Sequence, residues 1–135
     1  ICCCPSYPNT FSTSQPYESE LLGWYNVAHD YDGMLRWAYN SWAADPQYDS
    51  RYGHWMSGDT YFVYPFNRSS VRFERLIDGI EVAEMVRQLR KEGVDITPLE
   101  KVLEKIRATE PTDYTQPWQQ LISEARATLD EVSRK

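Results

Sequence analysis

The stretch that decides the fold of this chain is GMLRWAYNSWAADPQYDSRYGHWMSGDTYFVY, residues 33–64. Its first part, Met34–Asn40, alternates in a way that predicts a β-strand, with Trp37 and Tyr39 on one face. Both faces carry large side chains, so we expect this strand to be covered on both sides. Residues 40–57 mix aromatic rings with Asp, Asn, Ser and Pro, which is typical of a long loop that faces a ligand.

Three of the five tryptophans lie in this stretch, namely Trp37, Trp42 and Trp55. A sugar ring binds well to a flat apolar ring beside hydrogen-bonding side chains, so these residues predict a carbohydrate site. The alternative is that the same three rings fill a hydrophobic core. Composition alone does not separate the two interpretations.

Upstream of this stretch, the pattern predicts a strand over Ile1–Cys4 and then a helix over about Gln15–His29. Strand, helix and strand in this order make a βαβ unit, which places two parallel strands in a larger α/β sheet. Cys2, Cys3 and Cys4 are adjacent, so they lack the spacing of a zinc site, and their odd number does not indicate a disulfide framework. We therefore expect no metal and no cofactor.

Downstream, the periodicity changes to that of helices. Apolar residues at three- and four-residue spacing predict a helix from Ser70 to about Arg90, ended by Gly93. A capping-box threonine followed by proline predicts a second helix over about Pro98–Ala108, and a last helix covers about Gln116–Val132. Between the loop and these helices, Tyr61–Tyr64 forms a short strand-like run.

Length and charge restrict the possible functions. The chain has 135 residues, which is enough for one domain with a moderate core. Its net charge of −6 argues against binding to a phosphate backbone, so we expect no nucleic-acid partner. No apolar run is long enough for a transmembrane helix and no basic-then-apolar leader is visible, so we expect no membrane partner.

Five sequence blocks in a fixed order carry a resemblance to a known family. They are Gly33-x-Leu35-Arg36-Trp37-x-x-Asn40-x-Trp42, Asp45-Pro46, Trp55-x-x-Gly58-Asp59, Tyr64-Pro65 and Ser70-Val71-Arg72-x-Glu74-x-Leu76-x-x-Gly79-Ile80. Through these blocks the chain resembles the C-terminal part of the catalytic domain of glycoside hydrolase family 123, the β-N-acetylgalactosaminidase type, and its related domain of unknown function. Phe66 departs from the family pattern, in which a glycine usually follows Tyr-Pro, so we expect a different loop shape there.

The resemblance implies an α/β fold that is the C-terminal fragment of a (β/α)₈ TIM barrel, mostly helical by residue count. Ile1–Cys4 and Met34–Asn40 would be the last two barrel strands. We therefore predict a barrel segment over residues 1–92 and a helical hairpin over residues 93–135. Two parallel strands alone leave unpaired edges, so we expect the remainder of a parent barrel or self-association to cover them. The family is compatible with a bacterial parent that is secreted or periplasmic.

The resemblance also implies a function. The family hydrolyses N-acetylhexosamine-containing glycans with an adjacent Asp-Glu pair, in which Asp orients the acetamido group of the substrate and Glu is the acid/base. No position here matches that pair, since Asp130-Glu131 lies beyond the predicted barrel segment, so we expect this chain alone to bind carbohydrate without cleaving it. The expected substrate-binding residues are Trp37, Tyr39, Asn40, Trp42, Trp55, Asp59 and Tyr64, supported by Arg72 and Glu74. The alternative is a non-catalytic carbohydrate-binding or purely structural module.

Overall fold

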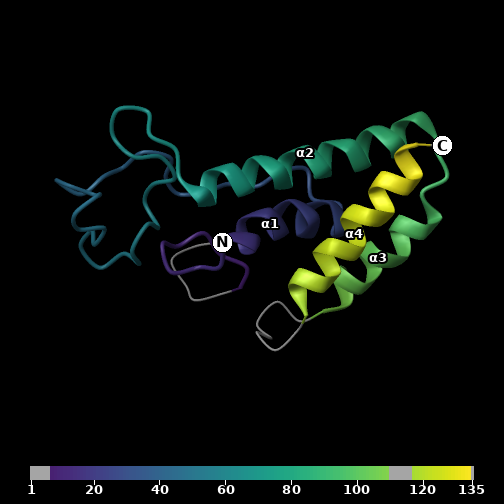
Figure 1. Ribbon diagram of the computed structural model, residues 1–135, viewed down its shortest axis with the longest axis horizontal. Coiled ribbons are helices and arrows are strands. Elements are labelled where there is room, and N and C mark those ends of the chain that lie inside the picture. The colour runs from purple at the N-terminus through teal and green to yellow at the C-terminus, as the bar shows by residue number, and fades with distance from the viewer. Residues whose placement is uncertain (1–6, 110–116, 135) are drawn as a thin grey trace.

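The computed structural model describes residues 7–109 and 117–134 and contains four helices within them. They are α1 (Pro16–Ala28), α2 (Val71–Glu92), α3 (Thr97–Ala108) and α4 (Trp118–Ser133). The four helices predicted from the sequence are therefore confirmed, with small shifts of their ends. Figure 1 shows the helices gathered on one side of the molecule, while the irregular chain between α1 and α2 forms the opposite end.

The helix ends lie where nearby residues satisfy free backbone groups. Before α2, the Ser70 hydroxyl accepts a hydrogen bond from the Phe73 amide at 3.1 Å, as an N-cap does. After α2, Gly93 has a φ of 73°, the left-handed conformation that commonly ends a helix. At the start of α1, the Glu18 carboxylate accepts a hydrogen bond from the Gln15 amide at 2.8 Å. These interactions are local, which is why the sequence predicts these helices well.

The predicted α/β fold is wrong. The described residues contain four helices and no strand or sheet, so they do not form a fragment of a (β/α)₈ barrel. Backbone pairing outside the helices is limited in this part of the chain to isolated bridges, such as those that join Asn40 to Tyr61 and Tyr64 to Arg68. The predicted first strand, Ile1–Cys4, lies outside the described residues.

The predicted strand Met34–Asn40 is an irregular segment instead. Leu35 is 86% exposed and Trp37 is 57% exposed, so the face that the alternation assigns to these two residues is not covered. A strand is stabilised by hydrogen bonds to a neighbouring strand, and alternation within one segment does not supply that neighbour. The alternation of large side chains therefore misled the prediction.

The helices α1 and α2 lie side by side because two glycines allow their backbones to touch (Figure 1). A Cβ placed on Gly23 of α1 would lie 1.9 Å from the Gly79 carbonyl oxygen of α2. A Cβ on Gly79 would lie 2.7 Å from the Glu20 carbonyl oxygen. Any side chain at these two positions would push the helices apart.

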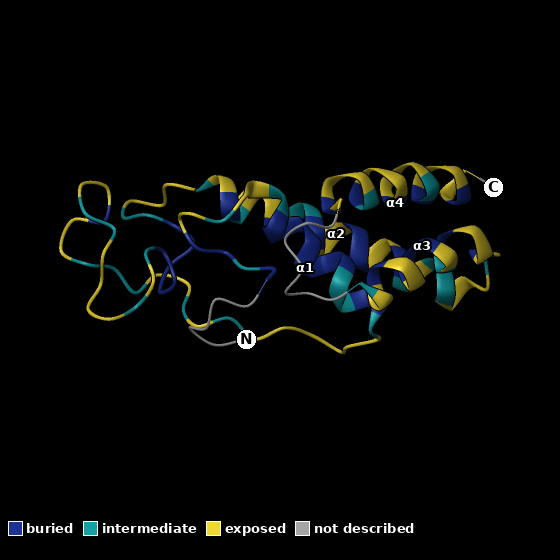
Figure 2. Ribbon diagram, turned by 90° about the horizontal axis from the view of Figure 1, so that it is seen from below, coloured by how far each residue is buried: buried dark blue, intermediate teal, exposed yellow. Residues whose placement is uncertain are grey.

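One hydrophobic core joins all four helices. Trp24 of α1, Val86 of α2, Leu103 of α3 and Trp118 of α4 are all at most 1% exposed and belong to the same cluster. Figure 2 shows the buried faces of the helices turned toward one another and the exposed residues on their outer faces. The hairpin of α3 and α4 shares this core, and the division into residues 1–92 and 93–135 stays a prediction.

A smaller hydrophobic cluster packs the irregular chain against α1 and α2. Leu22 of α1 and Leu76 of α2 pack with Phe62, and Phe73 lies against them. We call residues 33–70 the aromatic segment. It carries most of the exposed large apolar residues in the described part of the chain, namely Met34, Leu35, Trp37, Tyr39, Tyr48, Tyr52, Met56 and Phe66.

Candidate functional site

The aromatic segment folds back on itself and brings the predicted site residues together. The Phe62 amide donates a hydrogen bond to the Tyr39 carbonyl at 2.8 Å, and the Ser41 amide donates to the Thr60 carbonyl at 3.0 Å. The Thr60 hydroxyl also donates a hydrogen bond to the Ser41 carbonyl at 2.6 Å. These hydrogen bonds place the first part of the segment against its last part without forming a strand.

Trp37 and Trp55 form the accessible part of this arrangement. Their ring centroids lie 6.4 Å apart with an interplanar angle of 33°. Trp55 is partly buried, and the ring of His54 lies 4.6 Å from it. Tyr39 and Asn40 are exposed beside them in the chain. A flat ligand can therefore reach two indole rings and neighbouring polar groups from solvent.

Trp42 and Tyr64 are partly buried and make contacts within the protein. The Trp42 indole donates a hydrogen bond to the Val63 carbonyl at 2.6 Å. The Tyr64 ring meets the Tyr61 ring edge-on, with centroids 5.3 Å apart. The structure thus places these two predicted sugar-binding residues where they stabilise the aromatic segment.

Asp59 is buried, with an exposed fraction of 2%. Its Oδ1 lies 2.7 Å from Nη1 of Arg36, and Nη2 of Arg36 donates to the Gly58 carbonyl at 3.3 Å. The second carboxylate oxygen, Oδ2, is buried and has no hydrogen-bond partner among the described residues. The carboxylate of Asp59 therefore balances the charge of Arg36 and does not face solvent.

Arg72 reaches the same cluster from the first turn of α2 and is 7% exposed. Its Nη1 donates to the Thr10 carbonyl at 2.5 Å and to the Gly58 carbonyl at 2.7 Å. The guanidinium carbon lies 5.3 Å from the centroid of the Tyr61 ring. Burial lowers the pKa of the Arg72 guanidinium below its ordinary value, because the charged form loses hydration, and the nearby charge of Arg36 lowers it further.

The turn at Gly58 fits tightly around Arg72. Gly58 has a φ of 77°, and a Cβ on it would lie 2.4 Å from Ser12 Oγ and 2.7 Å from Arg72 Nη1. Only glycine fits this position. Glu74, in contrast, is exposed, and its carboxylate accepts a hydrogen bond from the Ser69 hydroxyl. The structure therefore brings Arg72 into the buried cluster and leaves Glu74 outside it.

We compared the chain with known protein families. The family described as glycoside hydrolase 123, catalytic domain, matches residues 1–89 of the 135. The chain belongs to glycoside hydrolase family 123. The resemblance inferred from the five sequence blocks is confirmed, and the matched range contains α1, the whole aromatic segment and most of α2.

A solved family 123 glycoside hydrolase from Clostridium perfringens has a similar fold. That structure is described as giving the details of glycolipid glycan hydrolysis. The TM-score is 0.77 at 23% sequence identity, and the similarity covers 98% of this chain and 26% of that one. This chain thus spans about a quarter of the length of that hydrolase, and the likeness shows the fold alone. No curated protein matches the chain.

Two residues of this region, Arg36 and His54, were not identified from the sequence as candidate site residues. The alternation placed Arg36 on the face opposite Trp37, so it was not considered as a partner of Asp59. Arg36 is a cation between large apolar residues, in a segment with few carboxylates. This pattern could have indicated that Arg36 pairs with Asp59. Nothing in the spacing of His54 distinguishes it from a solvated loop residue.

Within residues 7–109 and 117–134, no group of three or more His, Cys, Asp or Glu side chains is arranged to hold a metal ion. The helices of that same part of the chain are too short or too polar to cross a membrane. The three cysteines lie outside the described residues, and the expectation of no cofactor stays a prediction.

Proposed function

We propose that this chain supplies the carbohydrate-binding aromatic face of a family 123 glycoside hydrolase that acts on N-acetylhexosamine-containing glycans. The observation that carries the proposal is the pair of indole rings, Trp37 and Trp55, with centroids 6.4 Å apart at the protein surface. Exposed rings of this size are unusual outside binding sites when they are held in a fixed arrangement. The glycans of glycolipids, described for the C. perfringens hydrolase, are the natural ligands that we propose for this face.

The role that we propose for each predicted residue follows from its exposure to solvent. Trp37 and Trp55 stack on the sugar ring, and the exposed Tyr39 and Asn40 bind its hydroxyl or acetamido groups. Buried Asp59 acts indirectly, because its carboxylate fixes Arg36, which donates a hydrogen bond to the Trp37 carbonyl. The remaining residues of the proposed set, which hold the aromatic segment in shape, are Trp42, Tyr64, Arg72 and Glu74.

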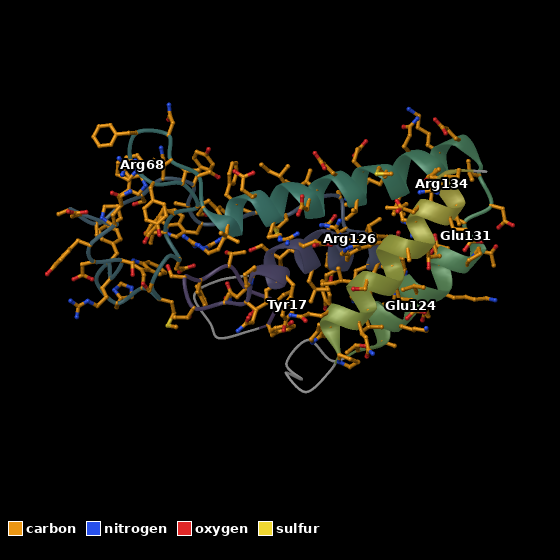
Figure 3. All side chains as sticks on the ribbon, in the orientation of Figure 1. Tyr17, Arg68, Glu124, Arg126, Glu131 and Arg134 are labelled. Atoms are coloured by element: carbon orange, nitrogen blue, oxygen red, sulfur yellow. The ribbon has the colours of Figure 1, made fainter. Side chains whose placement is uncertain are left out.

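The proposal assigns binding and not cleavage to this chain. Glycosidic cleavage requires one group that protonates the leaving oxygen and a second group that stabilises or attacks the anomeric carbon. The adjacent Asp130 and Glu131 lie in α4, and Figure 3 shows Glu131 at the end of the molecule opposite Arg68 of the aromatic segment. We therefore expect the chain by itself to release no nitrophenol from aryl N-acetylhexosaminides.

The proposal is tested by following the five tryptophan indole N–H signals by NMR while N-acetylgalactosamine or N-acetylglucosamine is added. We expect the signals of Trp37 and Trp55 to shift with concentration, because these rings are accessible. The signals of buried Trp24 and Trp118 should stay in place. Trp37→Ala should weaken binding by about 1–2 kcal/mol through lost stacking area.

Trp118→Ala serves as the control for this measurement, since that ring lies in the core and its loss should change stability alone. Equal losses of sugar affinity for Trp37→Ala and Trp118→Ala, after correction for the folded fraction, would assign the exposed rings to a structural module.

A further inference from the structure

Phe73, in the first turn of α2, contacts Tyr39, one of the exposed residues proposed to bind sugar. The two ring centroids lie 5.6 Å apart with an interplanar angle of 72°, which is an edge-to-face arrangement. Aromatic pairs prefer this geometry at centroid distances of about 4.5–7 Å, because the positive edge of one ring meets the negative face of the other. The contact therefore restrains the ring of Tyr39.

The backbone of Tyr39 is held at a second point. Its carbonyl accepts a hydrogen bond from the Phe62 amide at 2.8 Å. Phe62 is 3% exposed, and its ring centroid lies 6.2 Å from that of Phe73. Phe73 thus contacts both the Tyr39 ring and the residue that binds the Tyr39 backbone. With the backbone held, the side-chain torsions χ1 and χ2 decide where the phenol oxygen lies.

Phe73 is itself fixed at the start of α2. Its amide donates to the Ser70 hydroxyl at 3.1 Å, and this hydroxyl donates to the Phe62 carbonyl at 2.5 Å. Farther along α2, Gly79 meets the backbone of α1 and Val86 is buried in the main core. Figure 1 shows α2 running from the irregular chain across the helical part of the molecule. These contacts lie inside the described chain, so they do not depend on what covers its outer surface.

A fixed ring matters for binding because of conformational entropy. A tyrosine side chain without such a contact samples several χ1 rotamers, and a ligand that needs one of them must restrict the others. A ring that already occupies the required rotamer avoids this cost, which increases affinity without any new contact to the ligand. Tyr39 is 52% exposed, so Phe73 restrains the ring without burying it.

We propose that Phe73 is a positioning residue of the sugar site. It holds the Tyr39 ring in one rotamer, so that the phenol group meets a hydroxyl or acetamido group of an N-acetylhexosamine. This inference rests on the proposed function, because it takes Tyr39 as a sugar-binding residue. Phe73 does not touch the sugar itself, and its effect on binding passes through Tyr39.

The test uses Phe73→Leu, which keeps an apolar side chain against the small cluster but removes the aromatic ring. The rotamer of Tyr39 is measured by NMR from its three-bond couplings between Hα and Hβ. We expect one rotamer in the unmodified chain and an average over several in Phe73→Leu. Affinity for N-acetylgalactosamine or N-acetylglucosamine, followed through the indole signals of Trp37 and Trp55, should fall about threefold to tenfold.

Two comparisons separate positioning from a loss of stability. In a Tyr39→Ala background, Phe73→Leu should change the sugar affinity by less than about twofold, since no ring is left to position. Leu76→Val removes one methylene group from the same cluster, one turn farther along α2. It should lower the urea midpoint without changing the Tyr39 couplings or the sugar affinity.

A single Tyr39 rotamer in Phe73→Leu, or averaged couplings already in the unmodified chain, would show that Phe73 does not hold the ring. An equal loss of affinity in the Tyr39→Ala background would show that Phe73 acts through the stability of the aromatic segment. Either result would overturn the inference. If the unmodified chain bound neither sugar, the proposed function and the sugar role of Tyr39 would both be wrong, whereas the couplings decide separately whether Phe73 holds the ring.

Discussion

Two arginine side chains meet at one carbonyl oxygen, that of Gly58, beside a single buried carboxylate. Arg36 is paired with Asp59, whereas Arg72 is held by carbonyl oxygens and lies near the face of an aromatic ring. A guanidinium offers five donors in a rigid plane, so one Arg72 side chain can join backbone segments that no lysine could bridge in the same way. The cluster therefore connects the chain before α1, the Gly58 turn and the start of α2.

Replacing Arg72 by methionine should test this connection. Methionine keeps the length of the aliphatic chain but removes the donor of the Thr10 carbonyl oxygen and leaves the Gly58 carbonyl oxygen with only the longer bond from Arg36. We expect the free energy of unfolding to fall by about 2 kcal/mol, measured by urea unfolding followed with circular dichroism. Arg51→Met is the matched control, because Arg51 pairs with Asp49 at the surface and should change stability by less than about 0.5 kcal/mol.

An effect of Arg72→Met no larger than that of Arg51→Met would show that the buried cluster contributes nothing to stability.

Sequence reasoning identified Arg72 and Asp59 as site residues, because they belong to motif blocks and carry charge near aromatic rings. It could not assign their contacts. The partner of Asp59 is Arg36, 23 residues earlier, and the carbonyl bound by Arg72 at Thr10 lies 62 residues earlier. Contacts over such separations depend on how the aromatic segment folds back, which no local pattern encodes.

At the scale of secondary-structure elements, the crossing of α1 and α2 depends on Gly23 and Gly79. Alanine normally stabilises a helix interior by about 1 kcal/mol relative to glycine. We expect the opposite for Gly23→Ala, because its Cβ would lie 1.9 Å from the Gly79 carbonyl oxygen. The free energy of unfolding in urea should fall by about 2 kcal/mol or more as the helices separate.

Gly33→Ala is the control for this substitution, since nothing lies within 4 Å of a Cβ built at Gly33. Its stability should stay within about 0.5 kcal/mol of the unmodified chain. Equal or greater stability of Gly23→Ala would mean that the two helices do not meet at these glycines.

Helices and irregular chain were not equally predictable. The ends of α2 follow from Ser70 and Gly93, which act on backbone groups only a few residues away. Met34–Asn40 has the alternation of a strand, but a strand needs a partner, and among the described residues its only bridge joins Asn40 to Tyr61. The error in fold class therefore came from treating a pattern of side chains as proof of backbone pairing.

At the scale of the whole molecule, the hairpin of α3 and α4 is joined to α1 by a shared core and by an ion pair between a buried carboxylate and a half-exposed arginine. Glu20 of α1 is 3% exposed, and its Oε1 lies 2.6 Å from Nε of Arg126, the residue labelled on α4 in Figure 3. The Trp24 indole also donates to this carboxylate, at 3.1 Å. Sequence signals predicted α3 and α4 as helices, but they did not indicate that the two helices share one core with α1 and α2.

A shared core predicts that the chain unfolds as one unit, with no separate transition for residues 93–135. Trp118 is 1% exposed in that core, and its ring centroid lies 5.5 Å from that of Tyr7. Trp118→Ala should therefore lower the free energy of unfolding by about 3–5 kcal/mol. NMR signals of α4 and of Trp55 in the aromatic segment should disappear at the same urea concentration. If the α4 signals vanished first while Trp55 kept its folded signal, the hairpin would be an independent unit, as a division at residue 92 implies.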